Sequence, residues 1–157
     1  MTSGGKKFKE KIKKLGISLK IICLPKSTGT AMEAAWAVGC QLGQIAKSIV
    51  FKTGSGKPIL VITSGANRVD EKKLAKILGE EVQKADADFV KEKTGFAVGG
   101  VPPFGHKQKI STFIDKDLFK FSEIWAAAGD PFSVFKTTGE ELQKISGGKV
   151  MKIKQTA

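Results

Sequence analysis

The sequence predicts an α/β (α+β) protein in which a mixed, twisted sheet or partial barrel is surrounded by helices. Short apolar runs such as 18–24 and 58–63 have the length of strands, and capped, periodic segments of helical length lie between them. Because these segments do not follow a strict strand–helix–strand repeat, a mixed sheet is expected. The 157 residues contain no linker, low-complexity segment or repeat, so we expect a single domain spanning 1–157.

A basic helix is expected near the N-terminus, at about 6–15. Its apolar residues Phe8, Ile12 and Leu15 fall on one narrow stripe, and the other positions are mostly lysine. A membrane surface could receive such a stripe, but docking on the protein's own core is the more common arrangement.

Capping patterns place the other helices. Ser, Thr or Asp side chains accept hydrogen bonds from free amides at a helix start, and glycine ends a helix. The expected helices run from a Thr30–Glu33 capping box to about 42, over 71–78 between Asp70 and Gly79, over 86–94 before Gly95, and from a Thr138–Glu141 capping box to 145.

Strands are expected between these helices. The GSGK sequence of turn 53–57 is not a phosphate loop, because Phe51 stands where such a loop needs glycine and Pro58 where it needs Ser or Thr. The turn is therefore predicted to close a hairpin. The strands are predicted at 18–24, 46–52, 58–63, 111–114, 124–128 and 132–135, with a last edge strand at 150–154.

The net charge points to a polyanionic partner. Lys and Arg number 27 against 15 acidic residues, a formal net charge of +12. An excess of this size on a small protein favours nucleic acid. Arg68 is the single arginine, so contact with phosphates is expected rather than reading of bases. The alternative is a solvated, lysine-rich surface.

Cellular context is also predicted. No apolar run approaches the roughly 20 residues of a membrane helix, and residues 1–16 have no apolar core of a secretory signal. Cys23 and Cys40 lie in apolar surroundings without a CxxC partner, so they are expected to be reduced, buried thiols. A cytoplasmic protein is expected, with a zinc site or a disulfide as the alternative for the two cysteines.

The sequence lacks the usual catalytic constellations. With one histidine, His106, neither a metal cluster nor a Ser-His-Asp triad is expected. An enzyme with this sequence would work by positioning, backbone electrostatics and one lysine. Segment 94–107, with four glycines and two prolines, suits neither a helix nor a central strand. It is either a stiff loop that presents its backbone to a ligand or a tight connection between two strands.

Lys47 and His106 are candidate site residues. Lys47 precedes the apolar run IVF, where it is either a fixed cation beside a pocket or an ordinary lysine at a strand edge. His106 follows the glycine–proline loop closely enough to touch a ligand, although a lone histidine is more often structural.

Four ordered blocks resemble the YbaK/prolyl-tRNA synthetase-associated editing domain. They are STGTAMEAAWAVGCQLGQIAKSIVF, SGANRVDEKKLAKILG, TGFAVGGVPPFGH and AAGDPFSVFKTTGEEL, and the resemblance covers about 24–150. It implies a free-standing trans-editing deacylase that uses a positioned water to hydrolyse the ester of mischarged tRNA. Family members typically clear a small amino acid such as Ala or Cys, often from tRNA-Pro. The alternatives are a non-catalytic RNA-binding module and, more weakly, a DNA-binding protein.

The resemblance also implies the site and the partners. No metal or cofactor is expected; the partners would be the aminoacylated 3′ end of tRNA and an aminoacyl-tRNA synthetase, and the oligomeric state stays open. A bulky side chain at Gly100 would be expected to close the acyl pocket. The implied catalytic residues are Lys47, Gly99, Gly100 and Pro103, and the implied substrate-binding residues are Thr28, Thr30, Ser48, Val101, Pro102, Gly105, His106 and Asp130.

Overall fold

The computed structural model describes residues 2–156. Its helices are α1 (Ser3–Lys14), α2 (Ala31–Val38), α3 (Glu71–Leu78), α4 (Ala87–Thr94) and α5 (Gly139–Ser146), with short 3₁₀ helices η1 (Leu42–Gln44) and η2 (Lys116–Lys120). Its strands are β1 (Ile21–Cys23), β2 (Ile45–Thr53), β3 (Pro58–Ser64), β4 (Val82–Lys84), β5 (Ser111–Asp115), β6 (Ile124–Ala127), β7 (Ser133–Thr137) and β8 (Lys149–Met151).

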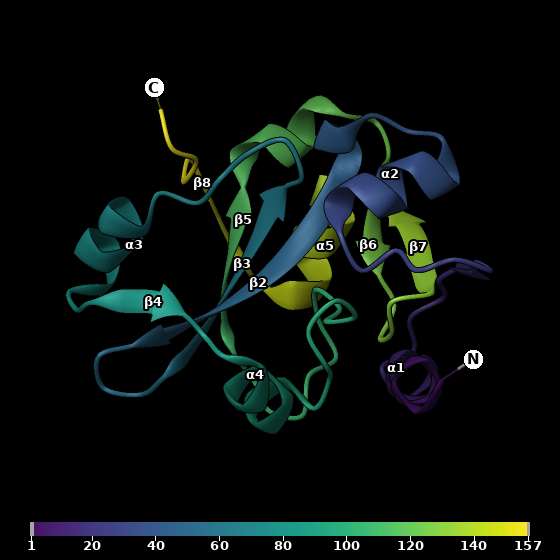
Figure 1. Cartoon of the computed structure of the whole chain (residues 1–157), viewed down its shortest axis with the longest axis horizontal. Helices are drawn as coiled ribbons and strands as arrows, with labels where there is room; N and C mark the ends of the chain where they lie inside the picture. Colours follow the sequence, from purple (N-terminus) through teal and green to yellow (C-terminus); the bar gives the residue numbers. More distant parts are fainter. Residues whose placement is uncertain (1, 157) are drawn as a thin grey trace.

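All eight strands belong to one open, twisted sheet with helices around it (Figure 1). The order is β1-β7-β6-β2-β3-β5-β8, and β4 pairs with β2 beside this path. Neighbours β2–β6, β3–β5 and β5–β8 are parallel, and the other pairs are antiparallel. The predicted mixed α/β fold is confirmed.

The central strand β3 is buried on both faces of the sheet. Side chains alternate along a strand, so Leu60 and Ile62 join the larger apolar cluster with Phe8 of α1, whereas Val61 joins a smaller cluster with Leu74 of α3. This double burial explains why β3 reads as a continuous apolar run. Both cores meet at β2 and β3, so these strands form a rigid base for the site described below.

Several predicted boundaries shift because of local capping. Helix α1 begins at Ser3, earlier than predicted, because the Thr2 hydroxyl accepts a hydrogen bond from the Gly5 amide. Helix α2 ends at Val38 rather than near 42, because Gly39 adopts a left-handed conformation with φ of 71°. The predicted box at Thr138 is only half formed: Thr138 caps the Glu141 amide, but the Glu141 carboxylate accepts from the Thr137 hydroxyl instead.

Tertiary pairing changes the strands at both ends of the sheet. The predicted strand at 18–24 shortens to β1, which pairs only with β7. The last strand is β8 at 149–151 rather than 150–154, because Ile153 turns into the core and Lys154 forms an isolated bridge with Val69. Strand β4 was not predicted, since its sequence VQK is short and mostly polar.

The expectation that both cysteines are buried is wrong. Cys23 is exposed at the end of the edge strand β1, Cys40 is partly buried after α2, and both thiols are free. A three-residue edge strand leaves the Cys23 side chain uncovered, which is why the apolar sequence neighbours of Cys23 did not ensure its burial. Within residues 2–156, none of the helices is long and apolar enough to cross a bilayer.

Candidate functional site

A pocket of about 320 Å³ opens where two strands part along one edge of β2. On this edge β2 pairs with β6 at Ile45 and Ala46, and with β4 from Phe51 onward. Between these two pairings, β2 has no strand partner on that edge within the described part of the chain, and residues 45–50 line the pocket. The gap in the pairing therefore creates the cavity, with β3 supporting β2 from its other side.

Segments distant in the sequence form the pocket walls. The loop before α2, the first turn of α2, α4, the loop after α4 and strands β6 and β7 all contribute. Small apolar side chains predominate in this lining. The predicted site residues that the structure brings together here are Thr28, Thr30, Lys47, Ser48, Gly99 and Val101.

Two lysines give the pocket a positive edge. Lys47 of β2 and Lys84 of β4 both line it, although they are far apart in the sequence. Partial burial lowers the pKa of Lys47 below its ordinary value, and the nearby charges of Lys84 and Arg68 lower it further. The arrangement suits an anionic or strongly polar group beside an apolar chamber. Sequence reasoning missed Lys84, because nothing in the local sequence indicates that β4 pairs with β2.

The three hydroxyl side chains of the pocket differ in what they bond. The Thr28 hydroxyl donates to the Pro131 carbonyl at 2.8 Å. The Thr30 hydroxyl caps α2, accepting from the Glu33 amide at 3.1 Å. The Ser48 Oγ is buried and has no hydrogen-bond partner among residues 2–156. A buried hydroxyl without a partner costs free energy, so Ser48 is the hydroxyl left to bond a ligand.

The glycine–proline loop joins α4 to β5 rather than joining two strands. The aromatic rings of Phe96 and Phe104, at the two ends of its central part, both pack on Phe8 of α1, with centroids 6.4 and 5.6 Å away. Between these anchors the loop meets the loop before α2. A Cβ on Gly99 would lie 3.6 Å from the Gly29 Cα, and Gly99 has φ of 93°, which disfavours other residues.

Gly100 faces away from the pocket. A Cβ built on it would lie 2.5 Å from the Asp130 Cα, so the backbones of 95–105 and 129–131 touch here. A larger side chain at Gly100 would therefore act by separating these loops rather than by filling the pocket. The Gly100 amide donates to the Ala97 carbonyl at 3.0 Å, whereas those of Gly99 and Val101 donate to no partner among residues 2–156.

The other predicted residues lie outside the pocket lining and support the loops. His106 is partly buried, and its Nε2 bonds the Pro102 carbonyl at 2.7 Å. Burial lowers the pKa of His106, the hydrogen bond to Pro102 opposes this, and the charge of Lys11 lowers it further. Asp130 accepts from the Thr2 hydroxyl and the Phe132 amide. The predicted residues outside the lining are Gly100, Pro102, Pro103, Gly105, His106 and Asp130.

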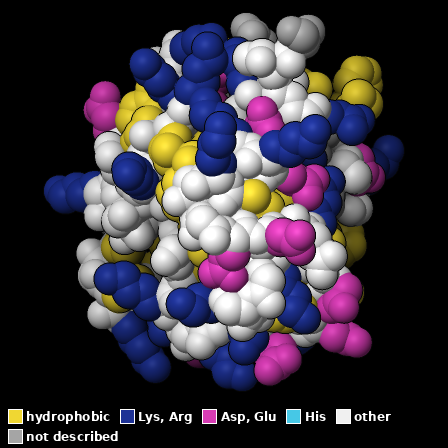
Figure 2. Space-filling view, turned by 90° about the vertical axis from the view of Figure 1, so that its left-hand side faces the viewer, with side chains coloured by type: hydrophobic (Ala, Val, Ile, Leu, Met, Phe, Trp, Pro, Cys, Tyr) yellow, Lys and Arg dark blue, Asp and Glu magenta, His cyan; other side chains and the backbone are white. Residues whose placement is uncertain are grey.

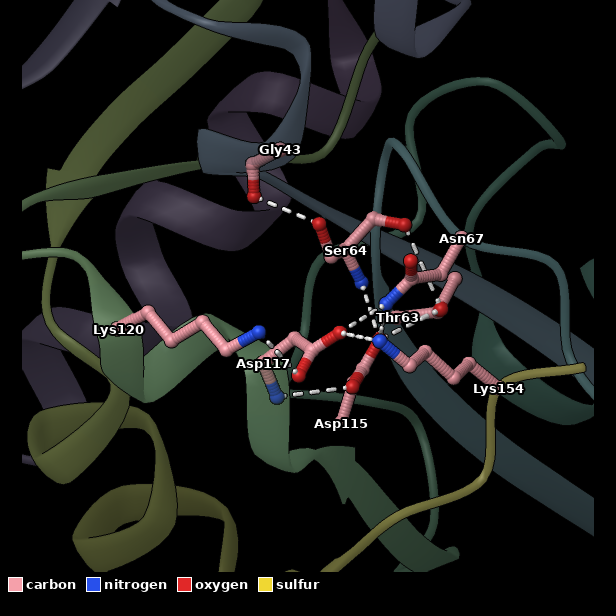
Figure 3. Close-up of polar contacts among 8 residues, drawn as sticks. All are labelled: Gly43, Thr63, Ser64, Asn67, Asp115, Asp117, Lys120 and Lys154. Atoms are coloured by element: carbon pink, nitrogen blue, oxygen red, sulfur yellow. Dashed lines mark hydrogen bonds and ion pairs between the residues drawn. The ribbon is translucent and has the colours of Figure 1, made fainter. Parts of the chain in front are cut away.

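A polar cluster fixes the end of β3 beside Lys47 (Figure 3). Thr63, which pairs with Lys47 across β2 and β3, donates to Asp115 at 3.1 Å. The fully buried Asp115 carboxylate also accepts from the Ser64 amide and the Asn67 side chain. Asp117 joins the cluster through Asn67 and two lysines, and hydrogen bonds from Lys154 and Asn67 hold its pKa far below the usual range. No local sequence pattern indicates this cluster, because its members are spread over more than 90 positions of the chain.

The electrostatic surface is not uniform. On the side of α3 and β4, basic side chains are interspersed with Asp and Glu (Figure 2). Helix α1, in contrast, carries six lysines and one glutamate. Within residues 2–156 there is no group of three or more His, Cys, Asp or Glu side chains placed to hold a metal ion.

Comparison with known proteins gives a consistent result. Residues 25–145 match the family model of the aminoacyl-tRNA editing domain. The chain is 32% identical to YwhH, an uncharacterized protein of Bacillus subtilis, over 79% of each chain. It is 31% identical to ProXp-y of Escherichia coli, a multifunctional Ser/Thr-tRNA deacylase, over 76% of this chain and 74% of the relative. A solved structure of a candidate trans-editing enzyme for prolyl tRNA synthetase superposes with a TM-score of 0.93, at 39% identity and 99% coverage of both chains.

Proposed function

The chain belongs to the aminoacyl-tRNA editing domain family and is an aminoacyl-tRNA hydrolase, and from this premise we propose that it clears a small amino acid from mischarged tRNA. We expect this amino acid to be one such as Ala or Cys, and the tRNA that carries it to be often tRNA-Pro. The support comes from the pocket, whose alanines and valines leave about 320 Å³. A chamber of this size and polarity suits a short acyl side chain together with part of the ribose.

The observation that carries the proposal is the unpartnered Ser48 hydroxyl in this apolar lining. Ser48 shares a sheet face with Ala46 and Val50, both buried, whereas Lys47 is exposed at the pocket edge. An ester carried by RNA enters from solvent, so the acyl group would reach Ser48 and the terminal nucleotide would stay near Lys47. The Ser48 hydroxyl would then bond the amino group or carbonyl of the bound amino acid.

Hydrolysis of such an ester needs a placed water and a stabilised oxyanion more than a strong base. The amides of Gly99 and Val101 are the donors available beside the acyl group, and a donor aimed at the oxyanion contributes on the order of 3 kcal/mol. Gly100 and Pro103 would hold the loop in shape. Lys47 would fix the terminal nucleotide or the acyl carbonyl by its charge.

The test is a deacylation panel on alanyl-, cysteinyl-, seryl- and prolyl-tRNA. We expect the wild-type protein to release at least one small amino acid faster than spontaneous hydrolysis, and Lys47→Ala to abolish this with the fold intact. Ser48→Ala should lower kcat/KM about 2- to 10-fold, the value of one hydrogen bond. Lys57→Ala, which removes an exposed lysine from the hairpin turn, is the matched control.

Distinct outcomes would contradict the parts of the proposal. Unchanged turnover in Lys47→Ala would remove Lys47 from the mechanism. A wild-type preference for prolyl-tRNA, or for none of the four, would contradict the assignment of a small mischarged amino acid.

A further inference from the structure

Helix α1 lies outside the segment that matches the editing-domain family, yet it is built against the site. The family match begins at residue 25, whereas α1 ends at Lys14. Phe8 packs between the two phenylalanines that anchor the glycine–proline loop. The Lys7 ammonium donates to the Gly95 carbonyl at 2.9 Å, and the Thr2 hydroxyl donates to Asp130 at 2.6 Å. The loop therefore has the pocket on one side and α1 on the other.

The exposed face of α1 carries more positive charge than helix stability explains. Lysines near the C-terminal end of a helix are favourable, but Lys6 and Lys7 lie in the first half of α1, toward the end where the helix dipole disfavours cations. None of the α1 lysines forms an ion pair with an acidic side chain within the described chain. Apart from Lys7, whose ammonium bonds the Gly95 carbonyl, these charges are left for an external anion.

A hollow beside α1 gives this charge a defined shape. It has a volume of about 460 Å³ and lies between the helix and residues 16–21. Lys9 and Lys13, one turn apart, line it together with Ser18 and with apolar residues of α1 and the following segment (Ile12, Ile17, Leu19 and Ile21). Two lysines and a serine along one open groove suit the repeated phosphates of a sugar–phosphate chain better than a single small ion.

The apolar face of α1 is not available to a lipid surface. Phe8 and Ile12 are 0% and 5% exposed, because they pack into the larger core. Leu15, just past the helix end, is exposed at 53%, whereas Ile17 and Leu19 beside it are partly buried. Interfacial helices need a buried apolar stripe as well as lysines, so a membrane is disfavoured and nucleic acid is favoured.

We propose that α1 binds the sugar–phosphate backbone of the tRNA acceptor arm while the 3′ end occupies the pocket. The proposal rests on the proposed function for the identity of the polyanion. Five lysines of α1 are exposed, and three of them, Lys6, Lys9 and Lys13, share one side of the helix at a helical spacing and contact the phosphates. Because lysine recognises phosphate as a point charge, the contact reads no bases.

The experiment compares two triple variants that remove the same charge. K6Q/K9Q/K13Q removes three of the six lysine charges of α1 while keeping polar side chains of similar helix propensity. K116Q/K144Q/K149Q neutralises three exposed lysines on η2, α5 and β8, near the sheet edge opposite β1. Binding of a fluorescent, non-aminoacylated acceptor-stem RNA hairpin ending in CCA is measured by anisotropy between 50 and 300 mM salt.

We expect the α1 triple to lower the slope of log K against log salt by about 2 to 3, since each lost phosphate contact removes roughly 0.9. If the affinities of wild type and variant converge at about 1 M salt, this change in slope amounts to a loss of roughly 40- to 300-fold at 0.15 M. The preference for full-length aminoacyl-tRNA over an aminoacylated CCA trinucleotide should fall by a similar factor. The control triple should change affinity and slope much less.

Three results would overturn the proposal. They are an equal loss of hairpin affinity in both triple variants, no loss of affinity in the α1 triple variant, or tighter binding of the protein to phosphatidylserine vesicles than to the hairpin. Circular dichroism and thermal unfolding establish that the variants fold, and the single variant Lys9→Glu gives the same test if the triple does not. Because the hairpin carries no amino acid, its binding does not depend on deacylation. Failure of deacylation would therefore leave this binding result standing, so the two proposals fail separately.

Discussion

Individual side chains at this site owe their properties to burial and to the partners they meet. Thr28 and Thr30 use their hydroxyls within the fold, whereas Ser48 keeps its hydroxyl unpartnered beside the exposed Lys47. His106 shows the opposite case: a partly buried titratable group whose ring is bonded to a backbone carbonyl within the fold. These differences cannot be read from residue type, because serine and threonine look equivalent in the sequence.

The lowered pKa of His106 predicts a pH dependence of stability. The folded protein protonates this imidazole less readily than the unfolded chain, whose histidine titrates at its ordinary value of about 6.5. The free energy of unfolding is therefore greatest above about pH 6.5 and falls as the pH drops from there through the lower folded pKa. The decrease from this group is at most about 1.4 kcal/mol per pH unit.

Urea unfolding at pH 7.5 and 5.5 checks this expectation. His106→Gln keeps a donor for the Pro102 carbonyl but does not titrate, so its stability should change less between the two pH values. An equal change in both proteins would mean that other groups cause the pH dependence.

At the scale of elements, the glycine–proline loop depends on its neighbours. Helix α1 holds both ends of its central part through Phe8, and the loop 129–131 contacts its middle at Gly100. The stiffness that proline gives the loop becomes useful only because these contacts fix its position. Any change that separates the loops should therefore reach the pocket.

Gly100→Ala tests this dependence. The new Cβ would lie 2.5 Å from the Asp130 Cα and 2.8 Å from the Asp130 carbonyl carbon, and neither backbone atom can move alone. We expect a loss of about 1–3 kcal/mol of stability and a fall in deacylation, measured by chemical denaturation and by turnover of the preferred substrate. Gly54→Ala in the hairpin meets only ordinary contacts at 3.8 Å or more, so it should be neutral or slightly stabilising. Full activity in Gly100→Ala would show that the loop contact is dispensable.

Across the whole molecule, the Asp115 cluster joins strands β3 and β5 to the C-terminal segment. The Ser64 amide and the Thr63 and Asn67 side chains all donate to one carboxylate oxygen, and Lys154 joins through Asp117 (Figure 3). Since Thr63 pairs with Lys47, the cluster also fixes the strand that supports the pocket.

Asp115→Asn should therefore destabilise the protein by about 3 kcal/mol, because one carboxylate oxygen accepts from three donors and the other from the Asp117 amide, and Asn offers an acceptor to only one of these two sides. Guanidinium unfolding measures the loss. Glu123→Gln, which removes an exposed ion pair with Lys136, is the control and should change stability by less than about 0.5 kcal/mol. A loss below 1 kcal/mol in Asp115→Asn would mean that the cluster reorganises or takes up water.

Much of the fold could be predicted because its signals are local. The caps at Thr30, Asp70 and Asp86 and the hairpin at 53–57 depend on residues within one or two turns. Two features were not predicted correctly, the strand β4 and the exposure of Cys23. Both depend on contacts with distant strands. For the site, Lys47 was indicated by the apolar run that follows it and then by the resemblance of ordered blocks, and Ser48 and Gly99 by the resemblance, whereas Lys84 had no signal at all.

The sequence by itself determined the mixed α/β class, the capped helices and the basic net charge, because these properties follow from residue types and short spacings, which the chain carries before it folds. Its four ordered blocks also indicated the editing family, through their resemblance to that family. Only the tertiary structure decided where β6 and β4 part along β2, and so which residues surround the pocket. It also decided that α1 lies behind the glycine–proline loop with its lysines outward. The reason is that strand pairing and helix docking join segments distant in the sequence, and burial of the whole core determines which of these segments pack together.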